Sequence, residues 1–586
     1  MVKFDFLDNG TVHIQTHYDQ KDRCAMVPGG RWVPRIRSWE YQLTPATASA
    51  MCQAFSNELS DEDRQKLQNI AAKLSLARSV KEGDFELQMP TTNFPPWHHQ
   101  LVSYNMAKQL FGLDCPESLG GGALLGLDMG CGKSKCTVDI ITNHPNQIRT
   151  VLVVCPASVI DVWTGNEDRQ GQFEIHAVPE AYKNMVICAV KGKDLTKKTT
   201  MAEQARFSAE HQNKQFVAVI NYESAWREPF ASWAKEVGFD LVVADEVHRI
   251  KSAGGKASKF FGQLGKTAKC RLGLTGTPLP HAPTDIFGQY RFLDPGIFGT
   301  SFTKFRSDYA VMGGFQGHQI LSYRNQEMLH NKIFLIGYRV MSKDVFDLPE
   351  FLPDTRTCEL SPEERRIYRQ MDTEFYAEIE SGEVTAANAL VKLLRLQEIT
   401  SGYLDKQPIG DSKKKLLADV MEDFDPKEPL VVFARFTNDL RAVKEVAEAQ
   451  GRKYAELSGS ENQLSQWQVG NYDVLGVQIQ SGKEGVDFTR ARYSIYYSLG
   501  FSLGDYEQTI KRLGRPGQLR AGMYIHLLAK ESVDFKVMKA LEQHRDVVAS
   551  VLDQYKGINE PDDVKDDDLD DKYSPAAALL SVPTMQ

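Results

Sequence analysis

Short apolar runs rich in β-branched residues constrain the fold of this chain more than any other feature. Four runs end at polar or glycine-rich turns, and Leu272–Leu274 follows them. The four are Ala123–Leu127, Val151–Cys155, Phe216–Ile220 and Leu241–Ala244. Continuous apolar strands separated by segments of helix length are typical of a parallel sheet covered by helices on both faces. The pattern predicts an α/β fold.

A second series of the same kind predicts a second α/β unit. Its strands are Leu430–Phe433, Val474–Val477 and Tyr493–Tyr497, with helix-like stretches such as Asp439–Ala449 between them. The segment between the two series reads as mostly helical, in Pro362–Glu380, Ala386–Thr400 and Lys413–Asp423. We therefore expect two lobes with parallel sheets and helical insertions between them.

The chain length of 586 residues allows about four compact units at roughly 150 residues each. We expect boundaries near residues 90, 296 and 425. The predicted parts are a small N-terminal module over 1–90, a first lobe over 91–295, helical insertions over 296–425, a second lobe over 426–545, and a helix end with an acidic tail over 546–586.

Composition excludes several classes of protein. With 42% hydrophobic and 25% charged residues, the chain can bury a sizeable core and is neither fibrous nor disordered. The nine cysteines are an odd number and include no C-x-x-C pair, which argues against a zinc ribbon and a complete disulfide framework. The N-terminus does not resemble a signal peptide, and no apolar run has the length of a membrane span. We expect an intracellular protein in a reducing compartment.

The net charge of −8 is concentrated near the C-terminus. Eight acids between Glu560 and Asp571, with Lys565 and Lys572, give −8 + 2 = −6, which leaves −2 for the rest of the chain. A near-neutral body can still carry a basic groove, so the acidity does not exclude nucleic acid as a partner. The tail is expected to be a solvated, disordered extension, with a partner-binding or nucleic-acid-mimicking role as the alternative.

A glycine-rich turn with the sequence DMGCGKS occupies residues 128–134, directly after the run Ala123–Leu127. Gly130 and Gly132 let backbone N–H groups turn around phosphates, Lys133 can reach the β- and γ-phosphates, and the Ser134 hydroxyl can ligate Mg²⁺. The first glycine of the usual phosphate-loop pattern would fall at Leu127. An ordinary glycine turn is therefore the alternative.

Two acids follow another predicted strand. Asp245 and Glu246 come directly after Leu241–Ala244. An acid at the end of a core strand can hold Mg²⁺, and the acid beside it can orient or deprotonate an attacking water. The alternative is a pair of solvated acids in a loop.

Two arginines follow the second series of strands. Arg512 and Arg515 are three residues apart, and on a helix this spacing places both guanidinium groups on one face. Such a pair suits bidentate contact with a γ-phosphate. A basic surface turn is the alternative.

In this order, the motifs resemble those of a Swi/Snf-type ATPase of helicase superfamily two over residues 90–545. The similar segments are PWHHQ at 96–100, the loop at 128–134, VVCPAS at 153–158 with Trp163, DEVH at 245–248, LTGTPL at 274–279, QSGKEGVD at 480–487 and the motif at 508–518. Residues 337–349 resemble the helical-insertion signature of that family. Pro280-His281 and the residues Gly-Lys-Glu-Gly at 482–485 depart from the family pattern.

The resemblance implies two RecA-like lobes that use ATP and Mg²⁺. It implies adenine recognition by Trp97 and Gln100, phosphate binding by Gly130, Gly132, Lys133 and Ser134, Mg²⁺ binding by Ser134 and Asp245, activation of water by Glu246, and contributions from Gln508, Arg512 and Arg515 of the other lobe. It also implies nucleic-acid contacts by Pro156, Ser158, Thr275, Thr277, Ser481 and Gly485.

The first 90 residues resemble the HARP-type module of annealing helicases over about 25 residues, in VPGGRW at 27–32 and WEY at 39–41. Trp32 and Trp39 could stack on bases beside Arg31, Arg35 and Arg37. The alternative is that both tryptophans belong to the core of a small β domain.

The expected function is that of a DNA-dependent ATPase that translocates on double-stranded DNA and remodels forks or anneals strands. Double-stranded or forked DNA is the expected partner, with a possible protein partner at 1–90 or at the tail. The compact insertions and short flanks are similar to bacterial and phage members, so a cytoplasmic monomer in a bacterial cell or phage-infected host is expected. The first alternative is an ATPase recruited by a partner to displace proteins on DNA, such as RNA polymerase. The second is a catalytically silent DNA-binding scaffold.

Overall fold

The computed structural model describes residues 2–7, 10–114, 120–167, 169–279, 282–313, 319–380, 386–405, 407–482, 486–515 and 517–552. The chain forms two compact units. The first unit comprises Met1–Leu279, Pro283–Tyr309 and Arg324–Val345, and the second comprises Pro280–Ala282, Ala310–Tyr323 and Phe346–Gln586. The predicted acidic tail lies outside the described residues.

The first unit begins with a small antiparallel sheet in the order β1-β2-β4-β3. Its elements are β1 (Lys3–Phe6), β2 (Thr11–Gln15), α1 (Lys21–Met26), β3 (Arg31–Val33), β4 (Ser38–Gln42), α2 (Pro45–Ala54) and α3 (Asp61–Glu82). Val12, Ile14 and Tyr41 from one face of the sheet form a core with residues of the helices. Helix α2 starts at a Thr44–Thr47 capping box. We call this part of the first unit, β1 to α3, the N-terminal module.

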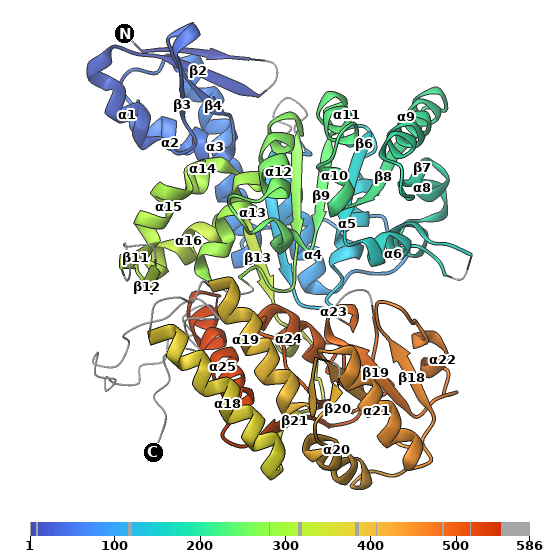
Figure 1. The fold of residues 1–586 in the computed structure, drawn as a ribbon. Helices are drawn as coiled ribbons and strands as arrows, with labels where there is room; N and C mark the ends of the chain where they lie inside the picture. The colour runs from blue at the N-terminus through green and yellow to red at the C-terminus, as the bar shows by residue number, and fades with distance from the viewer. Residues whose placement is uncertain are drawn as a thin grey trace. The chain divides into compact units, whose positions relative to one another are not determined.

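A seven-stranded parallel sheet forms the body of the first unit (Figure 1), in the order β13-β5-β10-β9-β6-β8-β7. Its strands are β5 (Gly121–Leu127), β6 (Thr150–Cys155), β7 (Met185–Ala189), β8 (Gln215–Asn221), β9 (Leu241–Asp245), β10 (Cys270–Leu274) and β13 (Gly337–Val340). Every residue of β5, β9 and β10 is buried, as expected for the centre of a covered sheet. The five strands predicted for the first lobe are confirmed.

Helices connect these strands. They are α4 (His98–Phe111), α5 (Lys133–Thr142), α6 (Ile160–Thr164), α7 (Gln172–His176), α8 (Pro179–Lys183), α9 (Leu195–His211), α10 (Tyr222–Ala225), α11 (Phe230–Val237), α12 (Lys256–Thr267), α13 (Ile286–Leu293), α14 (Pro295–Phe298), α15 (Phe302–Tyr309), α16 (Gln326–Ile336) and α17 (Ser342–Val345). The sequential βα order gives the parallel pairing of the sheet.

The second unit contains a six-stranded parallel sheet in the order β14-β21-β20-β17-β19-β18. The strands are β14 (Phe351–Cys358), β17 (Leu430–Ala434), β18 (Tyr454–Leu457), β19 (Val474–Gln478), β20 (Tyr493–Tyr496) and β21 (Gly522–Ala529). Its helices are α18 (Pro362–Glu380), α19 (Ala386–Thr400), α20 (Ser412–Glu422), α21 (Thr437–Ala449), α22 (Leu464–Gln468), α23 (Ile479–Gly482), α24 (Leu503–Ile510) and α25 (Val533–Leu552). Two parallel sheets in two compact units confirm the predicted α/β fold with two lobes.

The segment 296–425 is less uniformly helical than predicted. Helices α18, α19 and α20 match the prediction, but β13 pairs with β5 in the first unit and β14 pairs with β21 in the second. Two hairpins also occur there, β11 (Ala310–Gly313) with β12 (Gln319–Tyr323), and β15 (Tyr403–Leu404) with β16 (Gln407–Pro408). Strands β13 and β14 lie at sheet edges and are only partly buried, so they lack the continuous apolar run that marks a central strand. The boundaries at 90, 296 and 425 stay predictions.

No helix in the described ranges is both long enough and apolar enough to cross a membrane.

Candidate functional site

Three of the predicted motifs meet at the edge of the first unit's sheet that is formed by the carboxyl ends of three interior strands. Strand β10 lies between β5 and β9 and runs parallel to both. Leu274 at the end of β10 is level with Leu125 and with Asp245. Because the carboxyl ends of parallel neighbours share an edge, the loop at 128–134, the acids at 245–246 and the segment 275–279 come together there. This edge is the usual ligand-binding position of an open α/β sheet.

The glycine-rich loop has the backbone of an anion site. Gly130 and Gly132 adopt φ values of 81° and 86°, which favour glycine over other residues. Helix α5 begins at Lys133 directly after Gly132, and no side chain in the described part of the chain forms an N-cap hydrogen bond there. The N–H groups of that turn therefore lack a side-chain acceptor and can bind a phosphate.

The ammonium group of Lys133 lies at the end of β5, the strand that precedes the loop. Its Nζ donates to the carbonyl oxygen of Leu127 at 2.9 Å. A Cβ placed on Gly276 would be 3.7 Å from this ammonium group, so the third motif also borders it. The lysine charge is therefore held at the carboxyl end of β5, beside the third motif.

Asp245 is a buried carboxylate with a defined partner. The Nε1 of Trp163 donates to its Oδ2 at 2.9 Å, and the residue is 8% exposed. Burial and, to a smaller extent, the charge of Glu246 raise the pKa of Asp245 to about 6, against the lowering effects of the Trp163 hydrogen bond and of Lys133. A divalent cation would offset the cost of this buried charge, so the site fits Mg²⁺.

Glu246 belongs to a network that joins the second and third motifs. Its backbone has a φ of 55°, the left-handed region that is strained for a residue with a Cβ. Its Oε2 lies 3.3 Å from Nδ1 of His248, which in turn lies 3.0 Å from Oγ1 of Thr275. Thr275 Oγ1 also accepts from the N–H of Thr277 at 3.0 Å. The imidazole of His248 thus lies between the third motif and the carboxylate that is predicted to activate water.

Gln100 is placed at the phosphate loop. Its Oε1 accepts from the N–H of Trp97 at 3.0 Å, and its Nε2 donates to the carbonyl oxygen of Cys131 at 3.2 Å. A Cβ on Gly132 would lie 2.2 Å from that Nε2, which explains the glycine there. The Trp97 side chain is half exposed, and adenine recognition by Trp97 and Gln100 stays a prediction.

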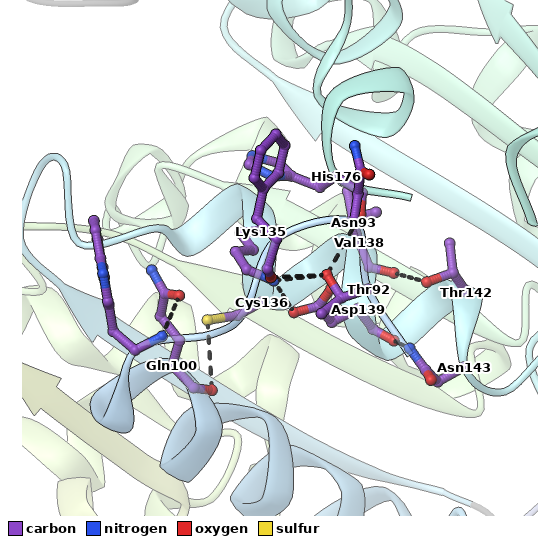
Figure 2. A network of polar contacts seen from close by, with 12 residues as sticks. Thr92, Asn93, Gln100, Lys135, Cys136, Val138, Asp139, Thr142, Asn143 and His176 are labelled. Atoms are coloured by element: carbon purple, nitrogen blue, oxygen red, sulfur yellow. Dashed lines mark hydrogen bonds and ion pairs between the residues drawn. The ribbon is translucent and has the colours of Figure 1, made fainter. Parts of the chain in front are cut away.

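The segment before Gln100 is fixed to α5 and α7 by a polar network (Figure 2). Lys135 Nζ donates to Asp139 Oδ2 at 2.7 Å and to Thr92 Oγ1 at 2.8 Å. Both charged residues are buried, at 5% and 1% exposure. Asn143 exchanges hydrogen bonds with the backbone of Thr91. The i, i+4 spacing of Lys135 and Asp139 was a sequence signal for this pair, which orders the turn that carries Trp97 and Gln100.

The three residues of the second unit that are predicted to act at the ATP site occur around the end of α24. Gln508 is 3% exposed, and its Oε1 has no hydrogen-bond partner among the residues that the structure describes. The prediction that Arg512 and Arg515 share a helix face is wrong, because α24 ends at Ile510 and both follow it. The side chains converge nonetheless, since the Nη1 atoms of both donate to the carbonyl oxygen of Val486, at 3.2 Å and 3.4 Å.

The residues predicted to contact nucleic acid differ in their accessibility. Ser158, after β6, is exposed, whereas Pro156 beside it is buried. Thr275 and Thr277 are buried, at 0% and 6% exposure. Ser481 in α23 is partly exposed, and Gly485 and Pro280-His281 lie outside the described residues. The Thr275 hydroxyl is used inside the protein, so among these residues Ser158 and Ser481 are the better placed for a direct contact.

Comparisons with known proteins agree with this geometry. A family model described as "SNF2-related domain" matches residues 38–402, and one described as "Helicase conserved C-terminal domain" matches 412–517. "Putative protein p41" of Acyrthosiphon pisum secondary endosymbiont phage 1 is 25% identical over 73% of this chain and 94% of its own length. The "Uncharacterized ATP-dependent helicase YqhH" of Bacillus subtilis is 22% identical over 80% of this chain and 81% of its own.

Among solved structures, the Sulfolobus solfataricus SWI2/SNF2 ATPase core in complex with dsDNA is 21% identical, with a TM-score of 0.36, over 80% of this chain and 95% of that one. The SNF2-related match alone covers more than half of the sequence and includes the first three motifs of the site. The chain therefore belongs to the SNF2-related family of helicase-like ATPases.

Proposed function

We propose that this protein is a DNA-dependent ATPase that translocates on double-stranded DNA and remodels DNA structures such as forks, with ATP and Mg²⁺ at the edge of the first sheet. The observation that carries the proposal is the meeting of three motifs at the ends of β5, β10 and β9. The loop after β5 supplies backbone N–H donors and Lys133 supplies positive charge. The two acids lie at the end of β9, which is separated from β5 by β10. This is the set of parts that phosphoryl transfer needs.

Each of these residues has a distinct role in the proposal. The N–H groups at Gly130 and Gly132 and the ammonium group of Lys133 bind the β- and γ-phosphates. Ser134 and Asp245 would hold Mg²⁺, which when bound neutralises charge on the phosphates. Glu246 orients the attacking water and accepts its proton.

The second unit contributes positive charge in the proposal. Arg512 and Arg515 converge on one carbonyl oxygen, so a movement of the segment around Val486 would redirect both guanidinium groups together. Charge of this kind stabilises the phosphoryl group during transfer rather than before it.

Dependence on DNA is supported by the network between Glu246, His248 and Thr275. The carboxylate proposed to activate water lies 3.3 Å from His248, which is hydrogen-bonded to Thr275 of the third motif, so binding that shifts 275–277 would change the surroundings of this carboxylate and with them the rate of hydrolysis. The Bacillus subtilis relative is named an ATP-dependent helicase, which is consistent with this assignment.

The proposal is tested by ATPase rates without nucleic acid and with single-stranded DNA, duplex DNA, forked DNA and RNA. We expect the largest stimulation with duplex or forked DNA. Displacement of a third strand from a triplex tests movement along the duplex without requiring strand separation. A rate that is equal with and without nucleic acid would contradict DNA dependence, and stimulation by a protein alone would favour the partner-recruited ATPase.

Two variants identify the site in the same assay. Lys133→Ala should abolish hydrolysis, because it removes the point charge at the β- and γ-phosphates. Glu246→Gln should still bind nucleotide but lose turnover, because the amide cannot accept the proton of water. Near wild-type hydrolysis by Glu246→Gln would refute the assignment of the acids.

A further inference from the structure

The N-terminal module and helix α12 of the first unit enclose a groove of about 330 Å³. The module is fixed in place beside this groove. Gln42 Nε2 donates to the carbonyl oxygen of Gly265 in α12 at 2.8 Å, and Thr44 Oγ1 donates to Asp294 Oδ1 at 2.6 Å. Thr44 and Asp294 are both buried. The groove is therefore a preformed feature of the first unit.

The polar face of the module's sheet forms one wall of the groove. Arg31 of β3 pairs with Glu40 of β4, and Trp32 pairs with Trp39. Because successive side chains of a strand point to opposite faces, Arg31 and Glu40 lie on one face and the tryptophans on the other. Arg31 and Glu40 line the groove, together with Gln42.

Helix α12 forms the opposite wall and carries positive charge only. Its sequence, KASKFFGQLGKT, contains three lysines and no acid. Lys259 and Lys266 are seven residues apart, which places them on one helix face, and both line the groove. Neither lysine has a carboxylate partner within the described part of the chain. They are thus available to an anionic ligand.

The balance of charge in the groove is positive. Arg31, Lys259, Lys266 and Arg291 line it, and Glu40 is the acid among the described lining residues. The Glu40 carboxylate lies 3.9 Å from Arg31, so these two charges partly offset each other and Lys259, Lys266 and Arg291 supply the positive balance. Such a concave cationic surface attracts phosphates.

We propose that this groove binds the sugar–phosphate backbone of a nucleic-acid strand. It adds a second DNA contact to the proposed function, separate from the carboxyl ends of β5, β10 and β9 where the three motifs meet. The charged groups favour a polymer over a small anion, because Lys259 and Lys266 are exposed and the Arg31 side chain is 68% exposed. Seven residues of α12 span about 10 Å, which is about three nucleotide steps of a duplex strand. The inference rests on the proposed function only in naming DNA as the nucleic acid.

The test uses the full chain with Lys259→Gln/Lys266→Gln and direct binding of labelled single-stranded, duplex and forked DNA across a range of salt concentrations. A plot of log affinity against log salt has a negative slope, and each lost phosphate contact should make it less steep by about 0.9 for duplex or about 0.7 for a single strand. The double variant should therefore reduce the steepness of the slope by about 1.4 to 1.8 and weaken binding severalfold at low salt. The maximal ATPase rate at saturating DNA should stay unchanged.

Two further variants make the result specific. Lys193→Gln/Lys197→Gln removes two exposed lysines elsewhere in the first unit and should leave affinity and slope unchanged. Glu40→Gln removes an acid from the groove and should tighten DNA binding, an effect of opposite sign that a folding defect would not produce.

Several outcomes would overturn the inference. An unchanged salt slope in Lys259→Gln/Lys266→Gln, or an equal loss in the Lys193/Lys197 control, would refute a phosphate contact in this groove. The inference would also be refuted if a synthetic peptide of the acidic residues 560–572 displaced DNA from the wild type while the double variant kept its full affinity for DNA. DNA binding is measured without ATP, so these results can be told apart from a failure of the proposed function. The proposed function would be refuted if the ATPase rate of the wild type did not change with DNA.

Discussion

The indole nitrogen of Trp163 donates a hydrogen bond of 2.9 Å to Oδ2 of Asp245, although the two residues are 82 positions apart. Trp163 is fully buried in α6, the helix that follows the exposed Ser158. A hydrogen bond to a carboxylate is stronger than one between neutral groups and fixes the direction of its lone pairs. Trp163 therefore orients the carboxylate that we assign to Mg²⁺.

We expect Trp163→Phe to raise the Mg²⁺ concentration needed for half-maximal ATPase activity severalfold. Phenylalanine keeps an aromatic ring in the buried site but removes the N–H donor, which costs about 1.5–3 kcal/mol when the acceptor is charged. A Mg²⁺ titration at saturating ATP measures the effect. The matched control is Trp233→Phe, because Trp233 Nε1 also donates to a carboxylate, Glu203 Oε2, at 2.7 Å. An equal shift in both variants would mean that the effect is not specific to Asp245.

Arg512→Ala and Arg515→Ala should each lower turnover far more than they weaken ATP binding. Their charge is proposed to act on the phosphoryl group during transfer, so its loss appears in kcat rather than in nucleotide affinity. Nucleotide affinity from a fluorescent analogue and kcat from steady-state rates separate the two effects. Arg520→Ala serves as a control, because this arginine forms an ion pair with Glu428 instead. Equal losses of binding and rate would identify ground-state contacts.

The sequence predicted all interior strands of the first sheet and β17, β19 and β20 of the second, because buried parallel strands form continuous apolar runs, but it missed the interior strand β21. It also located the loop before α5 and the acids after β9, since both follow such runs directly. The edge strands β13 and β14 were missed because half-buried strands carry no such run.

The contacts of Trp163 and His248 could not be predicted for a different reason. Each joins segments that are distant in sequence, and neither a spacing nor a composition bias marks the partner. The prediction that Arg512 and Arg515 share a helix face was wrong for another reason. A spacing of three residues places two side chains on one face only where the helix continues, and α24 ends at Ile510, before both arginines.

Trp32→Ala should weaken binding to forked DNA by about fivefold or more, if the exposed ring stacks on a base at about 1–3 kcal/mol. Trp32 is 44% exposed and packs edge-on against Trp39, with ring centroids 6.0 Å apart. Trp39 packs against the core of the N-terminal module, so Trp39→Ala is expected to lower stability instead. Fork affinity and thermal unfolding of both variants check the difference. Undiminished fork binding by a stable Trp32→Ala protein would leave both tryptophans with a structural role.

The stability of the first unit should fall as the pH drops from about 6.5 toward 4, and His144 should account for part of this loss. His144 is 8% exposed, and its Nε2 lies 3.1 Å from the hydroxyl of Tyr104. Burial, with a smaller effect from Lys108, lowers the pKa of His144 to about 4. The unfolded chain binds a proton in this window while the folded chain does not, so acid favours unfolding.

The size of the effect follows from the two pKa values. Protonation of His144 should lower the free energy of unfolding by about 2 kcal/mol at pH 5 relative to pH 7.5, and this loss should disappear only above about pH 7.5. His144→Gln keeps an acceptor for Tyr104 but cannot be protonated. Between pH 7.5 and pH 5, its free energy of unfolding from urea titrations should therefore fall by about 2 kcal/mol less than that of the wild type. His211→Gln changes an exposed histidine of α9 and should reproduce the wild-type dependence. If His144→Gln is as acid-sensitive as the wild type, the loss arises elsewhere, and His176, whose pKa burial also lowers to about 4, becomes the residue to change next.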